Sequence, residues 1–230
     1  MTYSMAELAK FLDHTNLKAN ATHEDIAKLC AEAKDHAFKT ACVNQVHTAE
    51  AARHLKGSDI GVCVTVGFPL GQTTITAKVF ETKEAISNGA NEIDYVINVT
   101  EAKAGNWGYI QDEMEQIVSA CNAAGVASKV IFENAYLTKE EIKKLSEIAS
   151  VVRPTFIKTS TGMAPTGATP EDITLMAQNG GVGVKASGGI RTAENFLTMV
   201  RAGATRVGAS ASIEIIEGLK QLYPSGEVNI

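Results

Sequence analysis

The chain has 230 residues, 45% of them hydrophobic and 20% charged, and its formal net charge at pH 7 is −5. These totals exclude a disordered chain, argue against a nucleic-acid partner and fit one α/β domain of barrel size. No stretch reaches the ~18 apolar residues of a membrane span, and the N-terminus lacks the apolar core of a signal peptide. Because the four cysteines are dispersed and form no CxxC pair, we expect a cytoplasmic enzyme with reduced thiols and no membrane contact.

Short apolar runs alternate with longer helical patterns along the chain. In order, the predicted strands are residues 11–14, 39–43, 60–66, 92–98, 128–133, 155–159, 182–187 and 205–209. Helix starts are marked by Thr22 and Thr138, each with an acidic residue three positions later, and by Thr169 before Pro170. Eight strand-then-helix units without a linker predict a single (β/α)8 TIM barrel over residues 1–230, with a short N-terminal helix. A doubly wound open sheet is the alternative.

Two lysines end neighbouring predicted strands, Lys158 in FIKTSTG and Lys185 in VGVKASGG. Side chains alternate along a strand, so both lysines can point into the barrel near its C-terminal end, where barrel enzymes hold their active sites. At ~4 Å and an effective dielectric of ~20, two ammonium groups repel by about 4 kcal/mol, which lowers the pKa of one amine by roughly three units. A neutral amine attacks carbonyl groups to form a Schiff base. The spacing does not indicate which lysine attacks.

An acidic residue lies within the apolar strand NEIDYVIN. Alternation places Asp94 on the inward face with Val96 and Asn98, where a carboxylate can orient a water and transfer protons. A purely structural pairing of Asp94 with a lysine is the alternative. On the next strand, Lys129 and Glu133 share a face, and we expect them to form a buried ion pair beside the site.

Glycine and serine follow the last two predicted strands. Ser187, Gly188 and Gly189 come directly after the seventh strand, and Gly208 and Ser210 after the eighth. Barrel enzymes often bind phosphate with these two loops, since glycines allow close approach of the backbone and serines add donors. The sequence therefore predicts a phosphate site at this end of the barrel.

Other candidate motifs carry little signal. The five histidines form no metal-ligand spacing, and there is no GxGxxG fingerprint or Walker A loop. Cys42 and Cys63 lie in apolar strands, which is typical of small core residues. The C-terminal segment 223–230 is polar and contains Pro224 and Gly226, so we expect a mobile tail that reaches toward the site.

The chain resembles the deoxyribose-phosphate aldolase family, whose members are class I aldolases. The similar stretches span nearly the whole chain in order: LDHTNL (12–17), VTVGFPLG (64–71), NEIDYVIN (91–98), FIKTSTG (156–162), GVKASGGIRT (183–192) and AGATRVGAS (202–210). The resemblance implies reversible cleavage of 2-deoxy-D-ribose 5-phosphate to D-glyceraldehyde 3-phosphate and acetaldehyde, in deoxyribose phosphate catabolism. It also implies a barrel fold, no metal, no cofactor, and a homodimer or larger homo-oligomer.

The resemblance also implies residue roles. Lys158 would form the Schiff base, Lys185 would perturb the pKa of the nucleophile and assist proton transfer, and Asp94 would exchange protons with Lys185 and a water. The sugar phosphate and acetaldehyde would be held by Thr161, Gly188, Gly189, Gly208, Ser210, Cys42 and Asp13. Met163 stands where some family members carry a lysine, so phosphate binding would depend more on backbone donors.

Two other functions fit the residues. A sugar-phosphate isomerase on the same barrel would use Glu133 or Asp94 as its base and a lysine as its electrophile. A barrel without catalysis would bind a phosphometabolite or a protein partner, although such a barrel has no need of two crowded lysines.

Overall fold

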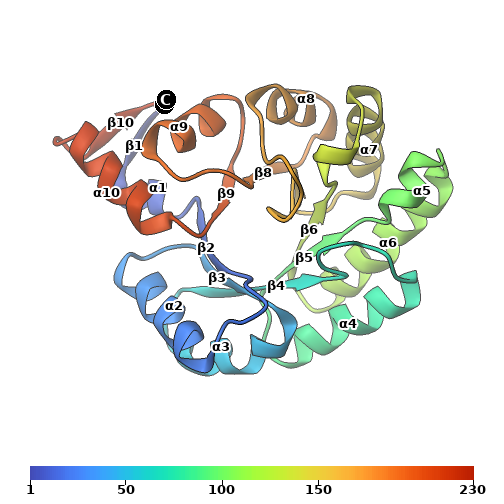
Figure 1. Ribbon diagram of the computed structural model, residues 1–230, viewed down its shortest axis with the longest axis horizontal. Helices are drawn as coiled ribbons and strands as arrows, with labels where there is room; N and C mark the ends of the chain where they lie inside the picture. The colour runs from blue at the N-terminus through green and yellow to red at the C-terminus, as the bar shows by residue number, and fades with distance from the viewer.

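Eight parallel strands close into a barrel in the order of the chain (Figure 1). The computed structural model describes residues 1–230. The barrel strands are β2 (Leu12–Asn16), β3 (Thr40–Val43), β4 (Gly61–Val66), β5 (Glu92–Val96), β6 (Ala127–Ile131), β7 (Phe156–Lys158), β8 (Gly183–Ser187) and β9 (Arg206–Ala209). The predicted (β/α)8 barrel is confirmed, and every predicted strand is present with ends that differ by one or two residues.

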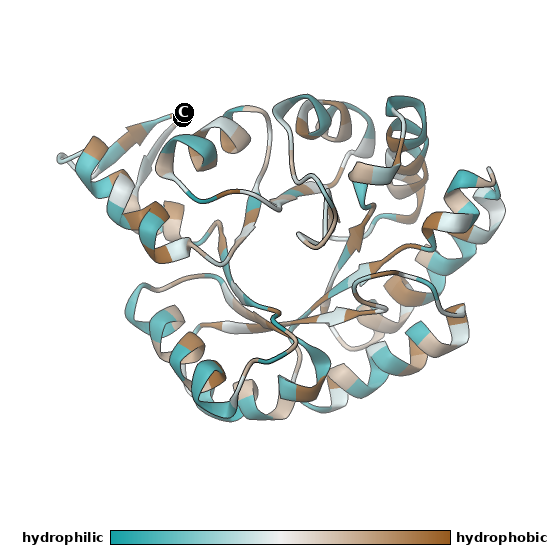
Figure 2. Cartoon of the chain, viewed as in Figure 1, coloured by the Kyte–Doolittle hydropathy of each residue, from teal (hydrophilic) through white to brown (hydrophobic).

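Helices form a ring outside the strands (Figure 1). They are α1 (Met5–Ala9), α2 (His23–Asp35), α3 (Thr48–Leu55), α4 (Ile75–Ser87), α5 (Val99–Lys103), α6 (Trp107–Ala123), α7 (Lys139–Val152), α8 (Pro170–Gly180), α9 (Ala193–Arg201) and α10 (Ser212–Leu222), with short 3-10 turns η1 (Gln45–His47) and η2 (Asn134–Tyr136). The predicted starts are confirmed: Thr22 and Thr138 form capping boxes, and Thr169 accepts from the third helical N–H of α8. The amphipathic helices turn their apolar faces to the barrel, and polar residues face outward (Figure 2).

The main apolar core lies between the strands and the helices, not inside the barrel. On β5, Ile93 and Tyr95 point outward and are fully buried in this core. Asp94, between them, points inward. The barrel interior consequently holds a network of charged side chains, and this network positions the site.

The two ends of the chain pair with each other. Strand β1 (Thr2–Ser4) runs antiparallel to β10 (Glu227–Asn229), and Val228 is fully buried. The expectation of a mobile tail that reaches toward the site is therefore wrong, because the tail is held as a strand at the edge of the molecule (Figure 1). None of the helices has both the length and the apolar character that crossing a membrane requires.

Candidate active site

The two lysines meet at one carboxylate. Lys158 on β7 and Lys185 on β8 are register partners, so their Cα atoms lie side by side. Each Nζ donates a hydrogen bond of 2.7 Å to the same atom, Oδ2 of Asp94 on β5. The two amines can therefore be no farther apart than twice that distance. The structure thus brings together the three residues that the sequence proposed for catalysis.

A third lysine occupies the other oxygen of Asp94. The Lys129 Nζ lies 2.5 Å from Asp94 Oδ1 and 2.8 Å from Glu92 Oε2. The predicted ion pair between Lys129 and Glu133 is wrong. Strand β6 ends at Ile131, and Glu133 has a left-handed backbone (φ 60°), so strand alternation no longer sets the direction of its side chain.

Glu133 instead holds the loop that follows β7. Its Oε1 accepts from the backbone N–H of Thr161 at 3.1 Å, and its Oε2 accepts from the Thr161 hydroxyl. The same hydroxyl accepts from the backbone N–H of Met163. Burial raises the pKa of Glu133 above its ordinary value, although both hydrogen bonds from Thr161 oppose this shift. Glu133 is therefore a positioning residue for a loop that borders the cavity.

A second layer of charge lies under Lys185. Oδ2 of Asp13 is 2.5 Å from Lys185 Nζ, and its Oδ1 accepts from Arg206 and from Thr40, each at 2.8 Å. Arg206 also donates to Glu92 at 2.8 Å. These pairs join β2, β3, β5, β8 and β9 across the inside of the barrel.

The buried network has one more basic group than it has carboxylates. The network contains three carboxylates and four basic groups: Asp13, Glu92 and Asp94, and Lys129, Lys158, Lys185 and Arg206. It is neutral when three of the basic groups are protonated. Burying an uncompensated charge is expensive, so the network favours the loss of one proton.

The electrostatics of the buried groups show which charges persist. Burial alone would raise the pKa of Asp94, but Lys129, Lys158 and Lys185 outweigh burial and hold it well below its ordinary value. Burial alone would lower the pKa of Lys185, but Asp13 and Asp94 outweigh it and raise that pKa above its ordinary value. These charges favour the protonated form of Lys185 in the resting site, so Lys185 is not the amine that the network most easily leaves neutral.

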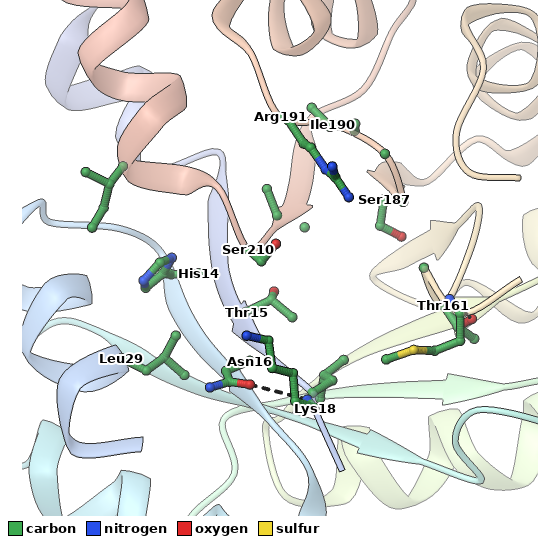
Figure 3. A pocket seen from close by; sticks show the side chains of 18 of the residues that line it. His14, Thr15, Asn16, Lys18, Leu29, Thr161, Ser187, Ile190, Arg191 and Ser210 are labelled. Atoms are coloured by element: carbon green, nitrogen blue, oxygen red, sulfur yellow. Dashed lines mark hydrogen bonds between the residues drawn. The ribbon is translucent and has the colours of Figure 1, made fainter. Parts of the chain in front are cut away.

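A cavity of about 480 Å³ opens above these residues, at the C-terminal end of the barrel (Figure 3). Its wall is built from the segments that follow β2, β7, β8 and β9, and Lys158 is part of it. Lys158 is 3% exposed, whereas Lys185 and Asp94 are fully buried and do not line the cavity. Sequence spacing left open which lysine could attack a substrate, and in the structure Lys158 is the one that reaches the cavity.

Five of the seven predicted substrate-binding residues line the cavity: Thr161, Gly188, Gly189, Gly208 and Ser210. The other two do not. Asp13 is fully buried beneath Lys185, and Cys42 packs with Leu17 and Cys63 in a small apolar group. Asp13 therefore acts on the site through Lys185 and the other basic groups of the network, not by contact with the cavity.

Two glycines are required by close contacts. A Cβ on Gly208 would lie 3.0 Å from Cε of Lys185, so this lysine would have to shift by a few tenths of an ångström. Gly188 has φ +87°, and its Cβ would lie 2.9 Å from the Cα of Gly167 in the loop before α8. These glycines allow the segment after β9 to lie close to Lys185 and the segment after β8 to lie close to the loop before α8.

Sequence reasoning missed several charged residues of the site. Arg206 and Glu92 complete the network inside the barrel, and the same alternation rule that found Asp94 could have identified them. Lys18 and Lys28 add positive charge to the cavity wall, and so does Arg191, which the stretch ASGGIRT had already suggested as an added charge. Figure 3 shows Arg191 beside Ile190 above the opening, with Ser210 to its lower left and Thr161 to its lower right.

Residues 8–221 match the model of the family described as DeoC/LacD family aldolase. The chain is 54% identical over 222 residues to a deoxyribose-phosphate aldolase from Lactobacillus acidophilus, covering 96% of this chain and 94% of the relative. It is 50% identical over 214 residues to a protein of the same name from Staphylococcus saprophyticus, covering 92% of this chain and 96% of the relative.

Solved structures resemble the whole barrel. A deoxyribose phosphate aldolase from Aeropyrum pernix, described as a tetramer, is similar with a TM-score of 0.88 and 30% identity, over 95% of this chain and 93% of that one. A protein described as QR15, an aldolase, is similar with a TM-score of 0.88 and 35% identity, over 95% of this chain and 98% of that one.

Proposed function

The chain belongs to the DeoC/LacD aldolase family, as its motifs predicted, and on this premise we propose that it cleaves 2-deoxy-D-ribose 5-phosphate reversibly to D-glyceraldehyde 3-phosphate and acetaldehyde. Two relatives that are 54% and 50% identical carry the name of this activity. The observation that carries the proposal is the contact of Lys158 with both the cavity and Asp94, because a Schiff-base lysine needs access to substrate and a proton-transfer partner.

The first step is imine formation at Lys158. In our proposal its neutral amine attacks the aldehyde carbon of the open-chain sugar, and the resulting carbinolamine loses water to give an iminium. The departing hydroxyl needs a proton, which the Lys185 ammonium can donate because it lies beside Lys158 and shares Asp94 with it. Iminium formation places a positive charge on the Lys158 nitrogen while Lys185 loses a proton, so the net charge of the network does not change.

Cleavage follows from the electron demand of the iminium. A base removes the proton of the C3 hydroxyl, the C2–C3 bond breaks, and its electron pair forms an enamine attached to Lys158 while glyceraldehyde 3-phosphate leaves. Protonation of the enamine carbon and addition of water then release acetaldehyde and regenerate the amine. We assign these proton transfers to Lys185 and Asp94 with a water, since Asp94 is hydrogen-bonded to both lysines.

The phosphate end of the substrate would lie against the loops after β8 and β9. Gly188, Gly189 and Ser210 border the cavity there, and Arg191 supplies a guanidinium. Met163, in the segment after β7 that also lines the cavity, offers no charge. We therefore propose that backbone N–H groups and Arg191 bind the phosphate.

The isomerase alternative loses its base in this structure. Glu133 is hydrogen-bonded to Thr161 and does not line the cavity. The Asp94 carboxylate is ionised, but both of its oxygens are already in contact with lysine Nζ atoms. Catalysis through Lys158 needs neither residue to reach a substrate carbon directly.

A direct assay tests the proposed activity. Purified protein with 2-deoxy-D-ribose 5-phosphate should release glyceraldehyde 3-phosphate, detected by a coupled dehydrogenase, and acetaldehyde in equal amounts. The unphosphorylated sugar should be cleaved with a much higher KM, since it lacks the group that the two loops bind. Absence of cleavage with both sugars, from protein whose circular dichroism is that of a folded α/β chain, would overturn the proposal.

We also propose a homo-oligomer in the cytoplasm. The Aeropyrum pernix relative is described as a tetramer, and large apolar side chains of this chain are exposed at Val46, Leu70 and Phe80. All four cysteines are free and buried, which suits a reducing compartment. Light scattering during gel filtration should give a mass at least twice the 24.4 kDa of one chain.

A further inference from the structure

Outside the active-site cavity, two histidines meet one glutamate on the surface between α2 and α3. His23 is the first residue of α2, and His47 ends η1 immediately before α3. Glu50 lies in the first turn of α3. Its Oε2 is 2.8 Å from Nδ1 of His23 and 3.5 Å from Nδ1 of His47. A third histidine, His54, lies one turn further along α3, with Nε2 4.0 Å from Oε1 of Glu50.

One of these nitrogens is buried without a partner. Nδ1 of His47 is inaccessible to solvent and makes no hydrogen bond, although it points at Glu50. A buried polar atom that lacks a partner costs free energy, and native structures rarely keep one without a reason. This nitrogen is therefore a free ligand atom directed into the cluster.

The spacing of the three groups fits one small cation. The ligand atoms of His23, His47 and Glu50 all lie within 4.8 Å of one another. A tetrahedral Zn²⁺ with Zn–N and Zn–O distances of ~2.0–2.2 Å holds its ligands at roughly 3.5 Å from one another. Movement of about an ångström, for example of the exposed His23 side chain, converts the cluster into this geometry.

The scaffold of the cluster is largely fixed. Side chains of His47 and Glu50 are each 13% exposed, whereas that of His23 is 87% exposed and free to move. Positions 47, 50 and 54 are spaced by three and four residues, so they share one face of the turn and helix. His23 comes from a different helix, α2, so no local spacing in the sequence could include it with the other groups.

We propose that His23, His47 and Glu50 form a site for one divalent transition-metal ion of the Zn²⁺ class, with water or His54 in the fourth position. Two imidazoles and one carboxylate suit zinc, whereas Mg²⁺ and Ca²⁺ prefer oxygen ligands alone. The N-terminal end of α3 disfavours a cation, and the carboxylate of Glu50 offsets this effect. The bound ion would fasten the start of α2 to α3. Asp25 and Lys28, which line the cavity, lie on the same helix α2.

Competition with a chromophoric chelator tests the site, using metal-free protein without a histidine tag. We expect one tightly bound Zn²⁺ per chain, no competition by Mg²⁺, and a visible d–d absorption band when Co²⁺ replaces Zn²⁺. His47→Gln and Glu50→Gln should each weaken Zn²⁺ binding at least tenfold. His23→Gln is the variant of choice if either of these fails to fold, because the His23 side chain is mostly exposed.

A matched control is His36→Gln, which removes a histidine at the other end of α2 and should leave Zn²⁺ binding unchanged. One equivalent of Zn²⁺ should also raise the Tm of the wild-type protein and of His36→Gln, but not of Glu50→Gln. The proposal is overturned if the chelator retains all of the Zn²⁺. It is equally overturned if His23→Gln, His47→Gln and Glu50→Gln all bind Zn²⁺ as tightly as the wild type, since the ion would then lie elsewhere.

Discussion

Lys158 and Lys185 stand opposite each other on adjacent strands, and both donate a 2.7 Å hydrogen bond to the same oxygen of Asp94. Asp94 draws the two amines together, yet its single charge cannot balance both. Because Asp13 provides a second carboxylate for Lys185, that lysine is fully paired and Lys158 is the amine in surplus. This difference in pairing supports the different roles that we propose for the two lysines.

Lys158→Arg should abolish turnover while leaving the protein folded. A guanidinium stays protonated at all accessible pH values and cannot form an imine, although it can still donate to Asp94. We expect a fall in kcat/KM of at least about a thousandfold, an order typical of losing a covalent nucleophile. Retention of more than a few per cent of wild-type activity, measured with the glyceraldehyde 3-phosphate assay, contradicts the covalent role.

Lys185→Leu should shift the pH dependence of turnover as well as its rate. Without the neighbouring cation, the protonated state of the nucleophile is less disfavoured, so the pH at which activity reaches half its plateau should rise by about one unit or more. The plateau itself should fall, because the proton donor is gone. Lys143→Leu, at a lysine exposed on α7, serves as the control. An unchanged pH profile in Lys185→Leu would show that the two amines do not interact.

Stability should decline in acid because of the buried carboxylates. Burial alone would raise the pKa values of Asp94 and Asp13. The neighbouring cations outweigh burial and hold both pKa values below their ordinary range; these cations are Lys129, Lys158, Lys185 and Arg206. A group whose folded-state pKa is depressed stabilises the fold fully above its unfolded pKa of about 3.9, and this stability is lost as pH falls through the folded-state pKa.

Urea unfolding followed from pH 7 to pH 3 measures this effect. The free energy of unfolding should stay nearly level above about pH 5 and fall below about pH 4. In Asp94→Asn the acid slope should be shallower, because one of the depressed carboxylates is gone. Equal slopes in the two proteins would contradict the ion pairing that the structure shows.

Glu133 should matter for substrate binding more than for chemistry. Glu133→Ala leaves the N–H and the hydroxyl of Thr161 without their acceptor, so the loop on the cavity border loosens. We expect KM to rise by roughly tenfold, the equivalent of about 1.4 kcal/mol, with a smaller change in kcat. Glu133→Gln keeps one acceptor oxygen and should lie between the two. A large loss of kcat at unchanged KM would indicate a direct chemical role instead.

Phosphate recognition can be tested from two segments of the cavity wall. Arg191→Met should raise KM for the phosphorylated sugar by roughly tenfold and leave kcat/KM for the unphosphorylated sugar unchanged, because only the phosphate meets this charge. Met163→Lys adds a cation to the part of the cavity wall that follows β7 and should lower KM for the phosphorylated sugar. Equal effects of Arg191→Met on both sugars would place Arg191 away from the phosphate.

The alternation of side chains along strands and the repeat of strands and helices were sufficient to predict the fold and the inward position of Asp94, Lys158 and Lys185. Asp94, Lys158 and Lys185 each lie within a strand, so a period of two was enough to point them inward. The same rule failed for Glu133, since it lies beyond the end of β6 with a left-handed backbone. Local rules apply only while the local structure continues.

Long-range pairings were beyond reach of the sequence. Asp13 meets Arg206 across 193 residues of chain, and β1 pairs with β10 between the two ends. These contacts arise from closure of the barrel, which brings the first strand against the last, and no local pattern records them. The pairing of Lys185 with Asp13, which distinguishes it from Lys158, is such a contact, so strand spacing could not separate the two lysines and only the family resemblance named Lys158.

The most direct test of the account is reductive trapping of the imine. The protein is incubated with acetaldehyde and sodium borohydride, digested, and mapped by mass spectrometry. We predict one ethyl group on the Nζ of Lys158, loss of activity in proportion to labelling, and no label in Lys158→Arg. Ethylation of Lys185 in place of Lys158, or complete turnover without any trapped lysine, would contradict the assignment of Lys158 as the nucleophile.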